Sequence, residues 1–288
     1  MNLIHFHGLN CYHDCIITIA DYFGLHYADS FATLWSETDF RYDSYHKVYT
    51  TRRMMTNLDA LGVKIESLAC PSQNDTARII SLFLEGEFMI VGMDAFYIPW
   101  NQFYRTFHGP HYFIAQKTKT EIFLCFDPTY NKENKQITCE EIIAHNFDIC
   151  RTSIGTKKPL QTDAIEEARE IMRTHSDTCS TLLAQIYNCV NEEQKNILML
   201  AKYVDAMICN RYLYRFFLEN QPIPYMENNL LLDDGFFLEW KAIKNGLYKA
   251  AIIKNNEGII NEIGGCFNQL MSEEISMAEK MIHGSALA

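Results

Sequence analysis

Several features that would place this sequence in a specialised class are absent from it. No apolar run approaches the ~18 residues that a membrane-spanning helix needs. The first residues lack the basic segment and apolar core of a signal peptide, so we expect a cytoplasmic protein without a membrane partner. Positive charge is also scarce, with 25 Lys and Arg against 36 Asp and Glu. The resulting net charge of −11 argues against nucleic acid as the main partner.

A dense cysteine framework is absent as well. The ten cysteines are spread widely along the 288 residues, so we expect most of them to be buried thiols in a reducing compartment, with one or two reactive. Glycine and proline are modest at 13 and 7 residues, and hydrophobic residues make up 48% of the chain. This composition excludes a disordered or fibrous protein and predicts a globular one.

Two different periodicities divide the chain near the Gly-Thr-Lys-Lys-Pro stretch at residues 155–159. Before this stretch, the pattern predicts a helix over residues 11–23 and strands over 88–93, 111–116 and 122–127, the last two forming a hairpin. After it, helical spacing dominates over residues 163–175, 197–208, 230–252 and 259–282. We therefore predict an α+β protein with a mixed domain at residues 1–155 and a helical domain at residues 156–288.

The opening segment places a cysteine at the start of the first predicted helix. Cys11 comes just before an apolar helical face, and a helix N-terminus stabilises a thiolate through its backbone N–H groups. The same N–H groups can receive the oxyanion that forms when a thiolate attacks a carbonyl. Cys11 is therefore the candidate nucleophile, whereas Cys15, one turn further on, is expected to pack inside.

A cysteine nucleophile also needs a base and a group that orients the base. His111 begins one strand of the predicted hairpin, and Asp127, sixteen residues later, ends the other. In a tight hairpin these positions lie side by side, so Asp127 can hold the His111 ring and favour its charged form. The candidate catalytic residues are therefore Cys11, His111 and Asp127.

Three other interpretations of the opening segment stay open. A metal site would draw on His5, His7, Cys11, His13 and Cys15, but no second ligand cluster follows downstream, so we expect no metal. A Cys11–Cys15 disulfide needs a bent segment and an oxidising compartment. In the third interpretation both cysteines are buried in the core and the histidine is structural.

An aromatic-rich connection separates the first two predicted strands. It runs from Asp94 to Pro110, and a connection of that length inside a compact domain is often functional. The candidate substrate-binding residues are Tyr97, Trp100, Tyr104 and Asp94. The alternative is that the aromatic side chains only pack beneath the loop.

Four features of the front half stand in a recognisable order: Cys11 and Cys15 at the helix start, Tyr22-Phe23-Gly24 at its end, His111 on a strand, and Asp127-Pro128 after the next. In this register, residues 1–155 resemble the papain-like fold, in particular the bacteriocin-processing cysteine peptidases. That resemblance implies a glutamine six residues before the nucleophile as an oxyanion donor. This chain has His5 there, and Asn10 stands beside Cys11, so these two side chains are the candidate donors.

The layout of the whole chain includes Asn-Cys-Tyr-His-Asp-Cys at residues 10–15 and Phe-Ala-Thr-Leu-Trp-Ser at residues 31–36, and it resembles the family of butirosin biosynthesis protein H. The resemblance implies a papain-like cysteine-protease fold followed by a helical domain, and acyl transfer in aminoglycoside antibiotic assembly. A γ-L-glutamyl-4-amino-2-hydroxybutyryl group would pass from an acyl-carrier-protein thioester to Cys11, and then to an amine of an aminoglycoside such as ribostamycin. No cofactor is implied beyond the phosphopantetheine of the carrier protein.

Two other functions fit the same features. A papain-like cysteine peptidase or amide hydrolase would need the same triad, although it would need only the front domain. A non-catalytic module would bind a carrier protein or a peptide. For the transferase, the acidic candidates for holding a polycationic acceptor are Glu37, Asp39, Asp43 and Asp94, and the basic candidates for docking an acidic carrier protein are Arg52-Arg53 and Lys157-Lys158.

Overall fold

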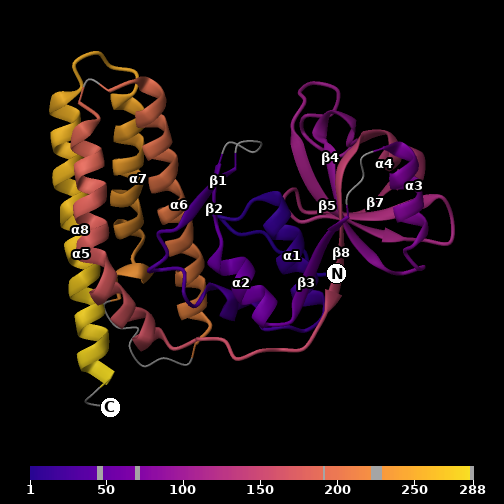
Figure 1. The fold of residues 1–288 in the computed structure, drawn as a ribbon, viewed down its shortest axis with the longest axis horizontal. Helices are drawn as coiled ribbons and strands as arrows, with labels where there is room; N and C mark the ends of the chain where they lie inside the picture. The colour runs from indigo at the N-terminus through magenta and orange to yellow at the C-terminus, as the bar shows by residue number, and fades with distance from the viewer. Residues whose placement is uncertain (44–47, 69–71, 191, 222–228, 286–288) are drawn as a thin grey trace. The chain divides into compact units, whose positions relative to one another are not determined.

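A computed structural model describes residues 1–43, 48–68, 72–190, 192–221 and 229–285 (Figure 1). The protein is α+β and forms two compact units. The sheet unit consists of Met1–Tyr27 and Leu58–Pro159, and the helical unit consists of Ala28–Asn57 and Leu160–Ala288. The chain leaves the sheet unit for the last time inside the predicted linker. Residues 28–57, however, belong to the helical unit and not to the front domain expected over residues 1–155.

The sheet unit is built on a six-stranded antiparallel sheet with the order β3-β8-β4-β5-β6-β7. Its strands are β3 (Val63–Leu68), β4 (Phe88–Asp94), β5 (Pro110–Lys117), β6 (Ile122–Asp127), β7 (Lys132–Thr138) and β8 (Asn146–Ile154). The three strands that the sequence predicts are confirmed as β4, β5 and β6. Ile114 pairs with Phe126, which confirms the predicted hairpin between the last two.

Helices cover both faces of this sheet. They are α1 (Cys11–Tyr22), α3 (Gln73–Ser81) and α4 (Cys139–His145). α1 contacts β4 and β5, whereas α3 and α4 supply residues to the cluster on the other face. The remaining elements of the front part are α2 (Arg53–Ala60) and the short 3-10 turns η1 (Tyr27–Phe31) and η2 (Ala95–Tyr97).

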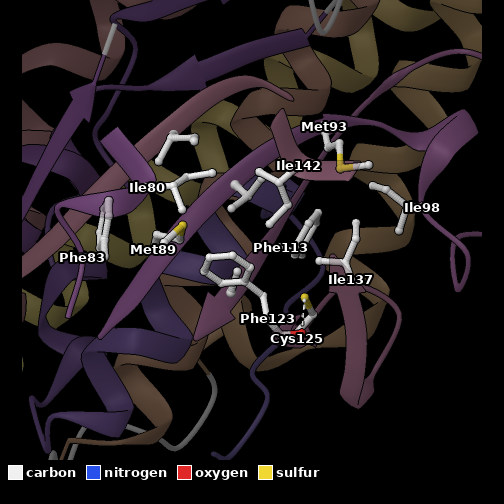
Figure 2. Packing of buried hydrophobic residues seen from close by; sticks show 13 residues of the cluster. Ile80, Phe83, Met89, Met93, Ile98, Phe113, Phe123, Cys125, Ile137 and Ile142 are labelled. Carbon is white, nitrogen blue, oxygen red and sulfur yellow. Dashed lines mark hydrogen bonds between the residues drawn. The ribbon is translucent and has the colours of Figure 1, made fainter. Parts of the chain in front are cut away.

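The face covered by α3 and α4 carries a continuous hydrophobic cluster (Figure 2). Alternate residues of a strand point to the same face, so Met89 and Val91 of β4 lie in one cluster with Phe113 of β5. Ile80 and Ile142 reach the same cluster from the two helices. Burial of a large apolar side chain contributes ~1.5–3 kcal/mol, so this cluster fixes the strands whose ends form the site.

The helix that carries Cys11 has a defined start and end. The Asn10 side chain accepts a hydrogen bond from the His13 amide at 3.0 Å, and such a cap contributes ~1 kcal/mol. At the other end, Gly24 has a φ of +69°, and the amides that follow Phe23 donate back to the carbonyls of Asp21 and Ala20. This is the Schellman ending, which glycine adopts without a steric cost. The helix predicted from residue 11 is confirmed.

Four long helices form the body of the helical unit (Figure 1), and they are α5 (Ala164–Asn188), α6 (Gln194–Glu219), α7 (Asp234–Ala250) and α8 (Glu257–Ser285). The four predicted helices are confirmed, with two differences. α5 continues well beyond residue 175. The stretch from residue 230 opens with the 3-10 turn η3 (Leu230–Leu232), because the Asp233 side chain caps α7 by accepting from the Gly235 amide. In the described parts of the chain, none of the helices has the length and apolar character needed to cross a membrane.

Trp35 explains why residues 28–57 belong to the helical unit. Its side chain is fully buried, its ring stacks on Tyr214 at 5.5 Å, and its Nε1 donates to Glu274 at 3.2 Å. Glu274 is itself buried and is paired with Arg211 and His175. Burial raises the pKa of Glu274, but these two partners outweigh that effect and lower it to about 2. Trp35 therefore joins a buried charge network that only the helices of this unit can supply.

A short hairpin from the same segment packs on α6. It consists of β1 (Phe40–Asp43) and β2 (Val48–Thr51), paired antiparallel. Phe40 and Tyr49 both meet the Tyr203 ring edge to face, with centroids 5.1 and 5.5 Å from it. The hairpin is therefore held to the helical unit through aromatic contacts that lie far apart in sequence.

Candidate active site

Cys11 is the first residue of α1 and is partly exposed. The first N–H groups of a helix have no acceptor within the helix, and the Asn10 side chain takes that of His13. The amides of Cys11 and Tyr12, the first two of the helix, are therefore candidate donors to an oxyanion that forms at the thiol. Asn10, one of the two predicted oxyanion donors, uses its side-chain oxygen to cap the helix.

His111 and Asp127 lie together, with Nε2 of the ring 2.8 Å from Oδ2 of the carboxylate. Both side chains are almost completely buried. His111 lies at the start of β5 and Asp127 at the end of β6, so the hairpin carries both residues to one end. Cys11 also interacts with His111, through a side-chain hydrogen bond and through charge. The structure thus brings the three predicted catalytic residues into one contiguous arrangement.

The charged form of His111 is favoured despite its burial. Burial lowers the pKa of His111, but its hydrogen bonds and charge interactions with Asp127 and Cys11 outweigh that effect and raise the pKa from 6.5 to about 9. At neutral pH the ring is therefore an imidazolium next to the Cys11 sulfur. A neighbouring imidazolium at a helix N-terminus is the arrangement that favours a nucleophilic thiolate.

Three donors hold the Asp127 carboxylate. Besides His111, Trp100 donates its indole N–H to Oδ2 at 2.9 Å, and the Tyr130 amide donates to Oδ1 at 3.2 Å. A fully buried carboxylate without such donors would be strongly destabilising. Trp100 was expected among the substrate-binding residues of the connection after Asp94. Its polar atom is instead used to position the acid of the triad.

Tyr130 is a neighbour of the triad that sequence reasoning did not find. Its ring lies 5.0 Å from the His111 ring, tilted by 42°. Burial and then the Asp127 charge raise the pKa of Tyr130, while a hydrogen bond with Gln102 opposes them. The feature that could have identified Tyr130 is the turn after Asp127. There the Asn131 amide donates to the Pro128 carbonyl, and the chain folds back toward the strand ends.

His5, the other predicted oxyanion donor, is held by an acidic residue of α1. Its Nδ1 lies 2.8 Å from Oδ2 of Asp14, and Thr129 donates to the same oxygen at 2.7 Å. Asp14 is fully buried, so burial raises its pKa, while the bonds from Thr129 and His5 oppose that rise. Residues at i and i+3 share one face of a helix. Asp14 therefore anchors His5 one helical turn from Cys11.

Asp94 is committed to the connection that it begins. Its carboxylate accepts from the amides of Phe96 and Gly109, each at 3.1 Å, and from Nδ1 of His108 at 2.6 Å. Partial burial raises the pKa of Asp94, but the His108 bond and the two amides lower it more. Asp94, predicted to bind substrate, thus holds the two ends of the loop together.

The two predicted tyrosines of this connection also have partners inside the sheet unit. Tyr97 stacks on His145 with ring centroids 3.5 Å apart. The guanidinium of Arg105 lies 5.0 Å from the Tyr104 ring centroid. Arg105 has a positive φ of 55°, so the chain bends sharply there. The aromatic side chains therefore stabilise the connection, which agrees with the packing alternative for Tyr97.

A second polar cluster begins at Tyr12, the residue that follows Cys11. The Tyr12 ring contacts Tyr112 at 4.9 Å, and the Tyr112 hydroxyl donates to Asp148 at 3.2 Å. The Cys150 thiol donates to the same oxygen at 3.3 Å. Burial, followed by the Asp148 charge, raises the pKa of Cys150 to about 12, so this thiol is unreactive at neutral pH. The cluster holds the start of α1 against β5 and β8.

The charged candidates for acceptor and carrier binding are partly paired within the chain. Glu37 is buried and lies 3.3 Å from Nε of Arg53. Lys158 donates to Asp59 at 3.0 Å. The side chain of Asp43 lies outside those that the structure describes. These charges are therefore less available to a ligand than the sequence alone suggests.

The alternatives for the opening cysteines have different outcomes. Cys11 and Cys15 are both free thiols, so no disulfide joins them. Cys15 packs inside the sheet unit, where burial raises the pKa of its thiol well above the ordinary value. Among the residues described, no three His, Cys, Asp or Glu side chains gather closely enough to hold a metal ion.

Comparison of the sequence with protein-family models and with curated proteins finds no match. The functional argument therefore rests on the site. Its geometry combines a cysteine at a helix start with a histidine held by a carboxylate, and in enzymes this combination serves nucleophilic attack on carbonyl groups.

Proposed function

We propose that the protein is a cysteine-dependent acyltransferase. One observation carries the proposal: the buried imidazolium of His111 lies between the Asp127 carboxylate and the Cys11 thiol at a helix N-terminus. This arrangement suits attack on an acyl carbonyl followed by departure of a thiol. We also propose a papain-like fold for the sheet unit. That proposal is supported by a nucleophile helix packed on an antiparallel sheet that supplies the base.

In the first half-reaction, the Cys11 thiolate attacks the carbonyl of a carrier-bound thioester and forms a tetrahedral intermediate. The amides of Cys11 and Tyr12 donate to its oxyanion. Collapse breaks the bond between the carbonyl carbon and the phosphopantetheine sulfur, and His111 gives its Nδ1 proton to the departing thiolate. Because one thioester replaces another, this step is nearly balanced in free energy.

In the second half-reaction, an amine attacks the acyl-enzyme, and the now neutral His111 accepts the proton that the amine loses. Collapse of this intermediate expels the Cys11 thiolate and restores the ion pair. An amide replaces a thioester, so the step is favourable and drives the whole transfer. A hydrolase would use water at this step and would release the acid.

The resemblance described above supplies the proposed substrates. We propose a γ-L-glutamyl-4-amino-2-hydroxybutyryl thioester of an acyl carrier protein as donor, and an aminoglycoside amine as acceptor. The presence of a helical unit in the same chain is consistent with a transferase, because a simple hydrolase of this type needs only the sheet unit.

Intact-mass measurement tests the proposal. The protein is incubated with the acyl-carrier thioester, and an increase equal to the acyl group is expected in wild type and in Cys266→Ala, which removes an exposed thiol of the helical unit. Cys11→Ala should show no increase. Absence of any adduct in wild type would contradict the proposal.

Discharge of the adduct separates transfer from hydrolysis. Ribostamycin should discharge the acyl-enzyme faster than buffer alone and should gain the mass of the acyl group. If buffer discharges the adduct equally fast and ribostamycin remains unmodified, the protein is a hydrolase.

A further inference from the structure

Two cavities of the helical unit share part of their lining. The first has a volume of about 530 Å³ and the second about 290 Å³, which is close to the range of small-molecule sites, roughly 300–1,000 Å³. Both are lined by Tyr49, Gln185 and Tyr203. We call the combined space the tyrosine groove. Its lining residues come from β2, α5 and α6, together with Thr38, Phe40, Cys189 and Glu192.

The aromatic wall of the tyrosine groove has a fixed orientation. Tyr203 is held edge to face against both Phe40 and Tyr49, at interplanar angles of 84° and 81°. Its hydroxyl also donates to the Thr38 carbonyl at 2.5 Å. A ring held by two aromatic contacts and a hydrogen bond loses little entropy when a ligand stacks on it. The wall is therefore preorganised for a flat or cyclic ligand.

The remaining lining is polar and carries charge of one sign. Amides and hydroxyls supply donors and acceptors along α5, including Gln185 and Asn188. Among the described lining residues, tyrosines and Cys189 aside, the ionisable side chains are Asp177 and Glu192, which are both acidic. Asp177 is exposed and has no hydrogen-bond or ion-pair partner within the described part of the chain. The groove therefore favours a cation and repels an anion.

A neighbouring cavity of about 510 Å³ offers a contrast. It is also lined by acidic residues, but Glu37 there already faces Arg53, and Asp39 lies 4.0 Å from Arg52. Glu166 and Glu170 there pair with Arg169 and Arg173, and Glu167 accepts from the Ser36 amide at 2.6 Å. Each acidic side chain that lines this cavity therefore has a partner within the chain. The unmatched Asp177 and the aromatic wall distinguish the tyrosine groove as a place for a ligand.

We propose that the tyrosine groove binds a hydroxylated ring that carries protonated amines, that is, an aminated sugar or aminocyclitol. The apolar face of such a ring stacks on Tyr49 and Tyr203, its hydroxyls bond the amides of α5, and its ammonium groups face the tyrosine rings and Asp177. The inference rests on the proposed function for the choice of ligand, because this is the class to which the proposed acceptor belongs. It adds a place in the chain where that class is held.

Equilibrium binding of ribostamycin to the full chain tests the inference. Isothermal titration calorimetry is carried out at neutral pH and low salt with Cys11→Ala protein, so that no acyl transfer can contribute. Ribostamycin should bind, whereas its fully N-acetylated form, with the same rings and no positive charge, should bind at least about tenfold more weakly.

Four variants locate the site. Tyr49→Ala should weaken binding by roughly tenfold because it removes a stacking ring, and Tyr49→Phe should bind like the parent. Asp177→Asn should weaken binding by about threefold to fivefold at low salt, with a smaller loss at high salt. Glu279→Gln, an exposed acid on α8 outside the groove, should have no effect. Because Asp177 is exposed, its substitution tests the site even if Tyr49→Ala perturbs the fold.

The outcomes separate this inference from the proposed function. The inference would be overturned if ribostamycin does not bind. It would also be overturned if Tyr49→Ala and Asp177→Asn both bind ribostamycin as tightly as the parent protein does. If an acyl adduct forms on Cys11 while the groove variants bind normally, only the groove assignment fails. If the groove variants lose binding but no adduct forms, only the transferase proposal fails.

Discussion

His111 sets the pH range of the proposed chemistry. Its folded-state pKa is raised from 6.5 to about 9, so the stabilisation of its charged form is complete below pH 6.5 and is lost as the pH rises through about 9. The imidazolium that protonates the departing thiolate is lost in the same range. We predict that the rate of acyl-adduct formation falls as the pH rises through about 9, measured by quenched mass spectrometry.

Asp127→Asn provides the comparison. This change removes the charge that raises the His111 pKa, so the fall in rate should move to lower pH. The rate at neutral pH should drop by roughly two orders of magnitude, the scale of lost general acid–base assistance. A fall that stays near pH 9 in the variant would show that another group causes it.

Trp100 donates its indole N–H to Asp127, so we predict that it acts by positioning this carboxylate. Trp100→Phe keeps a ring against Phe113 but removes the N–H that donates to the carboxylate. We predict a loss of ~1–2 kcal/mol in the free energy of unfolding and a fall of about tenfold in kcat, with KM little changed. Urea denaturation and steady-state kinetics measure the two effects. Phe103→Leu, in the same connection, is the control, and a large change in KM in Trp100→Phe would instead indicate substrate contact.

The site residues that could be predicted from sequence are those placed by a single helix or by a single hairpin. Cys11 follows from its helix, and His111 and Asp127 follow from one hairpin. The roles of Trp100 and Asp14 were not predictable, because each depends on a bond to a distant segment, 27 and 115 residues away in sequence. Periodicity reports which face a residue occupies but not which remote atom its polar group meets.

At the scale of a single strand, Gly92 of β4 shows how closely the site is packed. A Cβ at this position would lie 2.5 Å from the Phe147 ring and 2.7 Å from the Tyr112 ring. We predict that Gly92→Ala lowers the free energy of unfolding by ~1–3 kcal/mol, measured by urea denaturation. It should also slow adduct formation, because Tyr112 adjoins His111 on β5. Gly109→Ala, with open space at its Cβ, should change stability by less than ~0.5 kcal/mol. Equal stabilities of the two variants would contradict this account.

Helices and strands could be predicted where the capping residues and the spacing of apolar residues indicate the same element. α1 has a side-chain cap, an apolar face and a glycine ending, and it appears where the sequence places it. The helix expected from residue 230 starts later, since the Asp233 cap competes successfully with the apolar pattern. Element ends thus depend on single hydrogen bonds that periodicity does not report.

For the whole molecule, the division into units predicts the outcome of truncation. A chain that ends at Pro159 keeps residues 28–57 but loses the helices that bury Trp35. We predict that this fragment aggregates, because its large aromatic side chains become exposed. Size-exclusion chromatography and circular dichroism measure the effect.

The matched fragment replaces residues 28–57 with a flexible Gly/Ser linker. It removes the exposed aromatic side chains while keeping both segments of the sheet unit, so it should remain monomeric and folded. If the simple truncation behaves equally well, residues 28–57 do not need the helical unit. The sequence places this segment in the front domain. Its true unit could not be predicted, because Glu274, the hydrogen-bond partner of Trp35, lies 239 residues away in sequence.

That separation has a consequence for synthesis on the ribosome. Trp35 is made early, but Glu274 follows 239 residues later, and at about 5–20 residues per second the delay is roughly 10–50 s. Throughout this interval the growing chain exposes an aromatic segment that has no place to dock. We therefore expect chaperones to bind the nascent chain during this interval. Slow codons after Pro159 would prolong the exposure of the aromatic segment and increase losses to aggregation.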